Sequence, residues 1–167
     1  MKQWSKRTGM IVWGLAIALL VMAWILSWFY TGPNTVRALW YVGWGVWVCG
    51  AILIILPLVI IYGRAKGKKG QGWFESMSIV DSGVYSLVRH PLYLGWLLMY
   101  VVVIFFGQHW ITLVMGIAGI VCIYLIAIQE DMRLVVSFGE DYVRYMQKTP
   151  RMNILLGIVR ALQQRKK

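Results

Sequence analysis

Residues 89–131 read RHPLYLGWLLMYVVVIFFGQHWITLVMGIAGIVCIYLIAIQED, two long apolar runs separated only by Gly-Gln-His. So short a turn makes two helices antiparallel neighbours. From Gln108 the chain runs about 18 residues back to His90 and about 22 forward to Glu130, so at about 1.5 Å per residue the two outer ends differ in height by only about 6 Å. The stretch therefore predicts a helical hairpin whose two flanking charged pairs share one mouth.

The composition indicates an integral membrane protein. Of the 167 residues, 60% are hydrophobic and 14% are charged, whereas a soluble domain has roughly 45–50% apolar and about 25% charged residues. The length suits one domain, residues 1–167. The cysteines, Cys49 and Cys122, lie singly in apolar runs. With no Cys-x-x-Cys or Cys/His cluster, we expect neither a disulfide framework nor a metal site.

Four membrane spans are predicted, at about residues 9–30, 39–62, 90–106 and 110–128. A helix needs roughly 20 residues to cross a bilayer, with a lower limit near 17. The third span approaches this limit only if His90 and Pro91 form its first turn, where proline is well tolerated. The expected fold is an all-α polytopic membrane protein with four transmembrane helices and a helical tail.

The basic residues predict the orientation. With four spans, 16 of the 17 lysines and arginines fall on one side, and the positive-inside rule places that side in the cytoplasm. Both termini are therefore expected to be cytoplasmic. Because these residues flank apolar runs, anionic lipid headgroups are the expected partner, and nucleic acid is not.

The tail, residues 129–167, is also expected to be helical. We expect a helix to Phe138, a break at Gly139, a second helix to about Thr149 and a stop at Pro150. The last segment, ILLGIVRALQQRKK, is typical of an interfacial amphipathic helix. The connection GRAKGKKGQGW between spans two and three is expected to be flexible.

The predicted mouth gathers groups that can bind a polar ligand. They are Tyr85, Arg89, His90, Tyr93, Glu130, Asp131, Tyr142 and Tyr145. One interpretation is structural, an ion pair between Arg89 and Glu130 that closes the hairpin. The other is a ligand site, in which the carboxylates hold an amino group or ribose hydroxyls, the cations hold a carboxylate, and tyrosines stack on a base. S-adenosylmethionine fits this set, and so does NADPH.

Two segments resemble a known family. VDSGVYSLVRHPLYLG (residues 80–95) and EDMRLVVSFGEDYVRYMQKTPR (residues 130–151) are similar, in this order, to the two halves of a motif of the isoprenylcysteine carboxyl methyltransferase and phospholipid methyltransferase superfamily. The resemblance covers about Ile79 to Arg151. One departure is visible, since Asp131 stands where the family usually has a second glutamate.

The resemblance implies a membrane methyltransferase that uses S-adenosylmethionine, bound at the cytosolic ends of the last two spans beneath the tail. Carried over by position, His90, Tyr93, Gly95, Glu130 and Asp131 would line the cofactor site, with Tyr142 and Tyr145 as its cap. Tyr85 and Arg89, from the same mouth, complete the predicted cofactor-binding set. Because Asp131 is shorter by one methylene, Glu130 is expected to be the more important carboxylate.

The predicted reaction is methyl transfer to a hydrophobic or lipid-borne acceptor that enters laterally from the bilayer. A carboxylate acceptor is already nucleophilic, whereas an amine must first lose a proton, which His90 or Glu130 could take as catalytic residues. Two alternatives remain open at this point. One is an NADPH-dependent reductase of sterol-type double bonds, and the other is a small non-enzymatic lipid-binding membrane protein.

Overall fold

The computed structural model describes residues 3–30, 35–66 and 82–165. Its elements are α1 (Lys6–Tyr30), α2 (Arg37–Lys66), the short 3-10 helix η1 (Gly83–Ser86), α3 (Pro91–Gly107), α4 (Trp110–Phe138), α5 (Glu140–Lys148) and α6 (Ile154–Arg165). Since these ranges contain no strand, the prediction of an all-α chain is confirmed.

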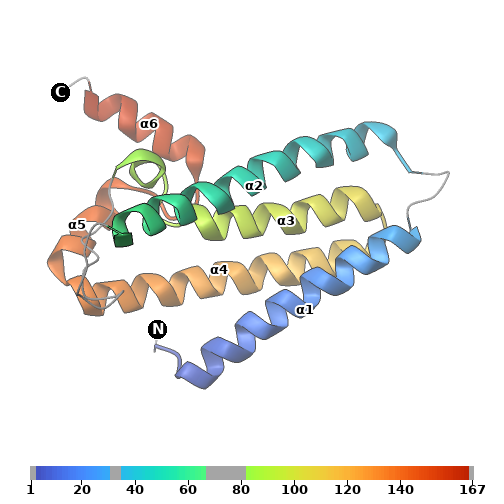
Figure 1. The fold of residues 1–167 in the computed structure, drawn as a ribbon, viewed down its shortest axis with the longest axis horizontal. Coiled ribbons are helices and arrows are strands. Elements are labelled where there is room, and N and C mark those ends of the chain that lie inside the picture. The colour runs from blue at the N-terminus through green and yellow to red at the C-terminus, as the bar shows by residue number, and fades with distance from the viewer. Residues whose placement is uncertain (1–2, 31–34, 67–81, 166–167) are drawn as a thin grey trace.

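The four long helices run lengthwise beside one another, as Figure 1 shows. Helix α3 is the central one and contacts α1, α2 and α4. The turn between α3 and α4 lies at one end of the bundle, while α5, α6 and both ends of the described chain lie at the other (Figure 1). The charged pairs that flank the α3–α4 hairpin therefore face the tail, as the short turn predicts.

Three of the described helices are long and apolar enough to cross a membrane, namely α1, the 37–60 part of α2, and α4. Helix α3 is equally apolar but has only 17 residues, close to the lower limit for a span. These helices make the chain a multi-pass membrane protein. The fourth span and the cytoplasmic position of the tail stay predictions.

Local signals set the bounds of the hairpin. Helix α3 begins at Pro91, with His90 as its N-cap, and ends at Gly107, with Gln108 as a C-cap in a left-handed conformation (φ 42°). The Gln108 side chain holds this conformation by hydrogen bonds to the backbone of Val36 and Phe105. His109 then caps α4, because its Nδ1 accepts from the Ile111 N–H. A turn fixed at each residue keeps the two helices antiparallel.

Helix α4 extends beyond the predicted span to Phe138, and Gly139 (φ 57°) separates it from α5. The predicted break is thus confirmed, and the tail helices α5 and α6 fall where the sequence places them. Helix α2 continues to Lys66, a turn beyond the predicted end at Tyr62. The rest of the lysine-rich connection lies outside the described residues.

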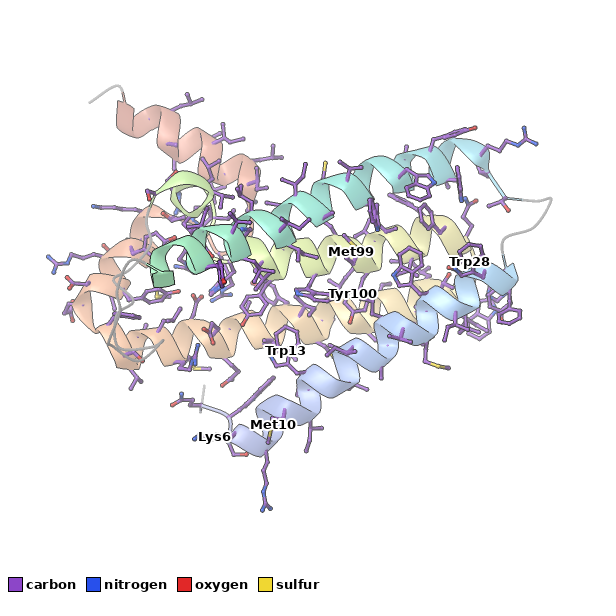
Figure 2. All side chains as sticks on the ribbon, in the orientation of Figure 1. Lys6, Met10, Trp13, Trp28, Met99 and Tyr100 are labelled. Atoms are coloured by element: carbon purple, nitrogen blue, oxygen red, sulfur yellow. The ribbon has the colours of Figure 1, made fainter. Side chains whose placement is uncertain are left out.

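Large side chains fill the centre of the bundle. Figure 2 shows Met99 and Tyr100 in its middle, Trp13 on α1 close to α4, and Trp28 at the end opposite Lys6. Tyr100 is buried and donates its hydroxyl hydrogen to the carbonyl oxygen of Ala16. This polar contact satisfies the phenol at membrane depth, where an unpaired group would be costly, and ties α3 to α1.

Candidate active site

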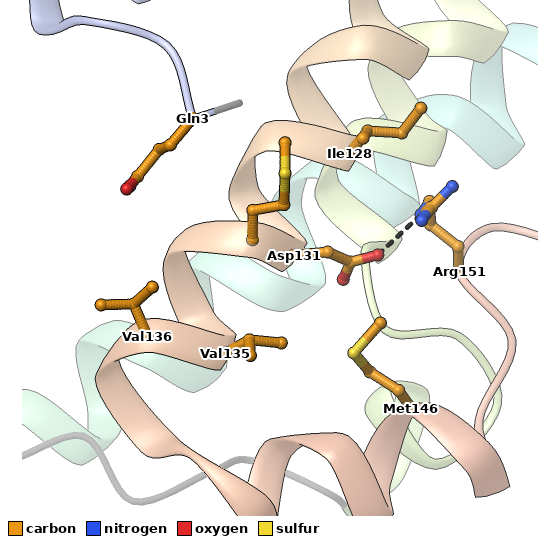
Figure 3. A pocket seen from close by; sticks show the side chains of 8 residues that line it. Gln3, Ile128, Asp131, Val135, Val136, Met146 and Arg151 are labelled. Atoms are coloured by element: carbon orange, nitrogen blue, oxygen red, sulfur yellow. Dashed lines mark hydrogen bonds and ion pairs between the residues drawn. The ribbon is translucent and has the colours of Figure 1, made fainter. Parts of the chain in front are cut away.

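The mouth of the hairpin is organised around Asp131, the residue that follows Glu130 near the end of α4. Its side chain is 3% exposed, and it receives donors from both the hairpin and the tail. Oδ1 lies 2.7 Å from His90 Nε2 and accepts the Tyr142 hydroxyl at 2.7 Å. Oδ2 accepts from Arg89 Nη2 at 3.0 Å and from Arg151 Nε at 2.7 Å. Figure 3 shows the last of these contacts.

Backbone hydrogen bonds join the same two parts of the chain. The amide of Arg89 donates to the Pro150 carbonyl oxygen (3.0 Å), and the amide of His90 donates to that of Arg151 (3.1 Å). These amides precede α3 and have no partner within that helix. Residues 150–151 therefore form a strap across the start of α3, and the Asp131 contacts lie directly beneath it.

The tyrosines predicted to cap the mouth are buried beside this strap. Tyr142 and Tyr145 lie edge to face, with ring centroids 5.8 Å apart, and the Tyr145 hydroxyl donates to the carbonyl oxygen of Tyr85 at 2.6 Å. Helix α5 is thus fixed to η1 by Tyr145 and to α4 by Tyr142. These contacts place α5 at the mouth, and its role as a cover over a cofactor stays a prediction.

The charges of the cluster favour an ionised Asp131. Two guanidinium groups and one imidazole surround a single carboxylate. Burial raises the pKa of the Tyr142 phenol, and its hydrogen bond to Asp131 raises it further, so Tyr142 stays a donor. Burial by itself lowers the pKa of Arg151, but the hydrogen bond and charge of Asp131, together with the contact to Tyr124, outweigh burial, and the pKa is raised. Both shifts favour the observed arrangement.

Glu130 has a different environment. It forms an ion pair with Arg133, one turn further along α4, and its side chain is 22% exposed. The negative charge of Glu130 also disfavours the anionic form of nearby groups. Tyr93, at the start of α3, lies within its electrostatic reach. Next to it, Gln129 Nε2 is buried without a hydrogen-bond partner among the described residues.

The structure therefore separates the two carboxylates that the sequence places together. Arg89 pairs with Asp131, so the ion pair between Arg89 and Glu130 that one interpretation of the sequence expects does not form. The four described contacts of Asp131 are all with protein groups, whereas Glu130 pairs, among the described residues, only with the half-exposed Arg133. Asp131 therefore joins the hairpin to the tail, and a ligand-binding role for Glu130 stays a prediction.

Gly95, predicted to line the cofactor site, packs against α2. A Cβ atom at Gly95 would lie 2.9 Å from the Gly50 carbonyl oxygen and 2.7 Å from Ile54 Cγ1. Only glycine allows α2 and α3 to approach this closely, as is common between membrane helices. This contact accounts for the glycine without any ligand.

Sequence reasoning did not include Arg151 among the site residues, although it makes two of the contacts described above. Besides Asp131, its Nη1 donates to the Tyr124 hydroxyl at 3.2 Å, and the guanidinium lies over the Tyr124 ring at 5.5 Å. The available signal was the position of Arg151 in the quoted motif, directly after Pro150.

Two clefts adjoin the Asp131 cluster. The smaller, of about 360 Å³, lies beside α4 and is mostly apolar, as Figure 3 shows with Ile128, Val135 and Val136. The larger, of about 800 Å³, lies between α3, the strap and α6. Arg151 and Met146 line both clefts. In the part of the chain that the structure describes, no group of three His, Cys, Asp or Glu could hold a metal ion.

Fold and site together define a multi-pass helical membrane protein with a buried polar cluster at one mouth. Residues 73–144 match the sequence model of the isoprenylcysteine carboxyl methyltransferase (ICMT) family. A curated methanethiol S-methyltransferase of Crocosphaera subtropica is 27% identical over 174 aligned positions, which cover 93% of this chain. The chain spans 63% of the length of that relative. No solved structure gives a significant match.

Both matches confirm the resemblance seen in the sequence. They support a likeness of this chain to the isoprenylcysteine carboxyl methyltransferase-type superfamily of membrane methyltransferases. The family match includes His90, Glu130, Asp131 and Tyr142. Neither comparison favours the reductase or the non-enzymatic lipid-binding alternative.

Proposed function

We propose that the protein transfers a methyl group from S-adenosylmethionine to a hydrophobic or lipid-borne acceptor at the cytoplasmic face of a membrane. The observation that carries the proposal is that the family match falls on the α3–α4 hairpin and includes its polar mouth. S-adenosylmethionine supplies an electrophilic methyl group on a sulfonium. The cytoplasmic face is supported by the distribution of basic residues.

The residues around Glu130 fit such a cofactor. The Glu130 carboxylate can accept hydrogen bonds from an ammonium group or from ribose hydroxyls, and the unpartnered Gln129 Nε2 can donate one. Tyr93 lies 5.8 Å from the Trp13 ring and 5.4 Å from the His90 ring. These faces suit an adenine base or a sulfonium cation. The other predicted ligands, Tyr85, Arg89, Gly95, Asp131, Tyr142 and Tyr145, would support this site by packing and positioning.

His90 is the proposed catalytic base. Its Nε2 is bonded to Asp131 Oδ1, which fixes the ring and leaves Nδ1 as the nitrogen that can take a proton. A buried carboxylate on the far nitrogen stabilises the imidazolium that forms, as in other carboxylate–histidine pairs. An amine or a thiol acceptor needs this deprotonation, whereas a carboxylate acceptor does not.

The acceptor would carry a nucleophilic oxygen, nitrogen or sulfur atom. The name of the Crocosphaera subtropica relative describes transfer to the sulfur of methanethiol, which adds a thiol to the carboxylate and amine predicted from the sequence. We propose that the acceptor approaches from the bilayer beside α1 and α2. The exposed apolar side chains of these two helices keep the route continuous with lipid.

The test is a methyl-transfer assay with the full chain in detergent. Purified protein is incubated with methyl-labelled S-adenosylmethionine and either native membrane lipids or a panel of aliphatic thiols, amines and carboxylic acids, and labelled products are identified by mass spectrometry. We expect one labelled product class, together with calorimetric binding of S-adenosylhomocysteine. Binding of NADPH in place of S-adenosylhomocysteine, or of neither, would refute the proposal.

A further inference from the structure

The larger cleft has a charge that the proposed function leaves unexplained. Among the residues that the structure describes, Arg89, Arg151 and Arg160 line it and no acidic residue does. Asp131 compensates part of this charge, because Arg89 and Arg151 share its Oδ2. Arg160 donates to the Gln147 carbonyl oxygen, which carries no charge. Within the described ranges, three cations therefore face one carboxylate, which leaves the cleft an excess of positive charge.

One of these cations is buried with an unused donor. Arg89 is 8% exposed. Within the described ranges, two buried side-chain nitrogens lack a hydrogen-bond partner, Arg89 Nε and Gln129 Nε2. A buried N–H without a partner is unfavourable, so this guanidinium is not fully compensated by the protein. An anionic oxygen in the cleft would neutralise part of the excess charge.

The opposite wall of the cleft is apolar and follows a membrane helix. Leu94, Leu97 and Leu98 occupy positions i, i+3 and i+4 of α3, which places them on one face of that helix. The first of these leucines lies one turn after the start of α3, which is the end next to Arg89. The apolar wall therefore leads from the cationic end of the cleft into the bundle. Leu155 of α6 also lines the cleft and is 76% exposed, which opens the cleft toward lipid.

Helix α6 is held beside the cleft by a close backbone contact. A Cβ atom at Gly157 would lie 2.0 Å from the Leu87 carbonyl oxygen. Only glycine permits this approach, and it fixes the height at which Arg160, three residues later, meets the cleft. In Figure 1, α6 lies at the end of the bundle where α3 begins.

From these features we infer that the cleft between α3, the strap and α6 binds one anionic phospholipid of the surrounding membrane. Its phosphate lies at Arg89 and Arg160, and an acyl chain lies along Leu94 and Leu97. Charge complementarity selects an anionic lipid over a zwitterionic one. The same charge disfavours the sulfonium cofactor in this cleft, which agrees with its proposed place near Glu130. The inference does not depend on methyl transfer.

The test is native mass spectrometry of the full chain in detergent, with phosphatidylglycerol and phosphatidylcholine of identical acyl chains. We expect one phosphatidylglycerol per protein, bound roughly tenfold more tightly than phosphatidylcholine. Arg160→Gln should weaken this binding by about three- to tenfold, since one charged contact is lost. Arg144→Gln is the matched control, because Arg144 is an exposed arginine paired with Asp141 on α5 and should leave the affinity unchanged.

Two further arms identify the source of the ligand chemistry. Leu94→Trp fills the apolar wall and should weaken phosphatidylglycerol binding, while soluble glycerol phosphate at the same concentration should not displace the lipid. Equal binding of the two lipids, or equal losses in the Arg160 and Arg144 variants, would overturn the inference. So would displacement by glycerol phosphate, which indicates a free-phosphate site, or by S-adenosylhomocysteine, which indicates that the cleft holds the cofactor.

Discussion

Replacing Asp131 by asparagine is the most direct perturbation of the site. The change keeps the shape of the side chain but removes the one negative charge between Arg89 and Arg151, whose side chains are 6% and 26% exposed. One oxygen also becomes an NH₂ group, which must then face a donor. Breaking a buried ion pair by removing one partner is unfavourable by about 3–5 kcal/mol.

This loss should appear first in the tail. Groups from two parts of the chain are bonded to Asp131. Arg89 and His90 belong to the hairpin, and Tyr142 belongs to α5. A change of about 3–5 kcal/mol shifts the docking equilibrium of α5 and the strap by roughly a hundred- to a few-thousand-fold. We expect faster hydrogen exchange at the amides of residues 142–151, with little change in the α3–α4 turn.

The adjacent carboxylate supplies the control. Glu130→Gln removes the same charge from the same helix, but its partner Arg133 is half exposed, and such pairs contribute about 0–1 kcal/mol. Its tail should therefore exchange like that of the wild type. If Asp131→Asn leaves exchange and thermal stability in detergent within the range of Glu130→Gln, then Asp131 does not hold the tail and the reasoning is wrong.

Three other outcomes are expected. His90→Gln should lower turnover with amine or thiol acceptors by about 10²–10⁴-fold and affect a carboxylate acceptor far less; an equal loss for all acceptors in steady-state assays would assign His90 to binding. Gly157→Ala should push α6 away from Leu87, seen as faster proteolysis after Arg160 while the thermal transition of the bundle moves little; unchanged proteolysis would refute the contact. Single cysteines at Ser5 and Gln163 should resist impermeant thiol reagents in intact cells, and labelling of either from outside would reverse the topology.

Much of the fold could be predicted because its signals are local. The three-residue turn, the proline at the start of α3 and Gly139 after α4 each act within a few residues. The height of the two charged pairs also follows from counting residues along two antiparallel helices. The short length of α3 was equally visible in the sequence.

The roles of the two carboxylates could not be predicted in the same way. Glu130 and Asp131 differ by about 100° around the axis of α4, and residue counting gives height but not rotation. The rotation depends on how α4 packs against α3, where Tyr100 and Ile123 are buried together. The place of Arg151 depends on a turn of the chain after α5, which has no periodic signal.

The convergence of the tail on Asp131 has a consequence for how the protein is made. Its partners Arg89 and His90 leave the ribosome before it, but Tyr142 and Arg151 follow. Until Arg151 has been synthesised, Asp131 has only part of its bonds, and α5 has no strap to hold it. The spans can therefore insert during translation, whereas the polar mouth is completed after insertion. A nascent chain that stops between residues 131 and 151 would carry an incompletely compensated carboxylate at the bilayer boundary, a feature by which quality-control proteases could distinguish it from the finished protein.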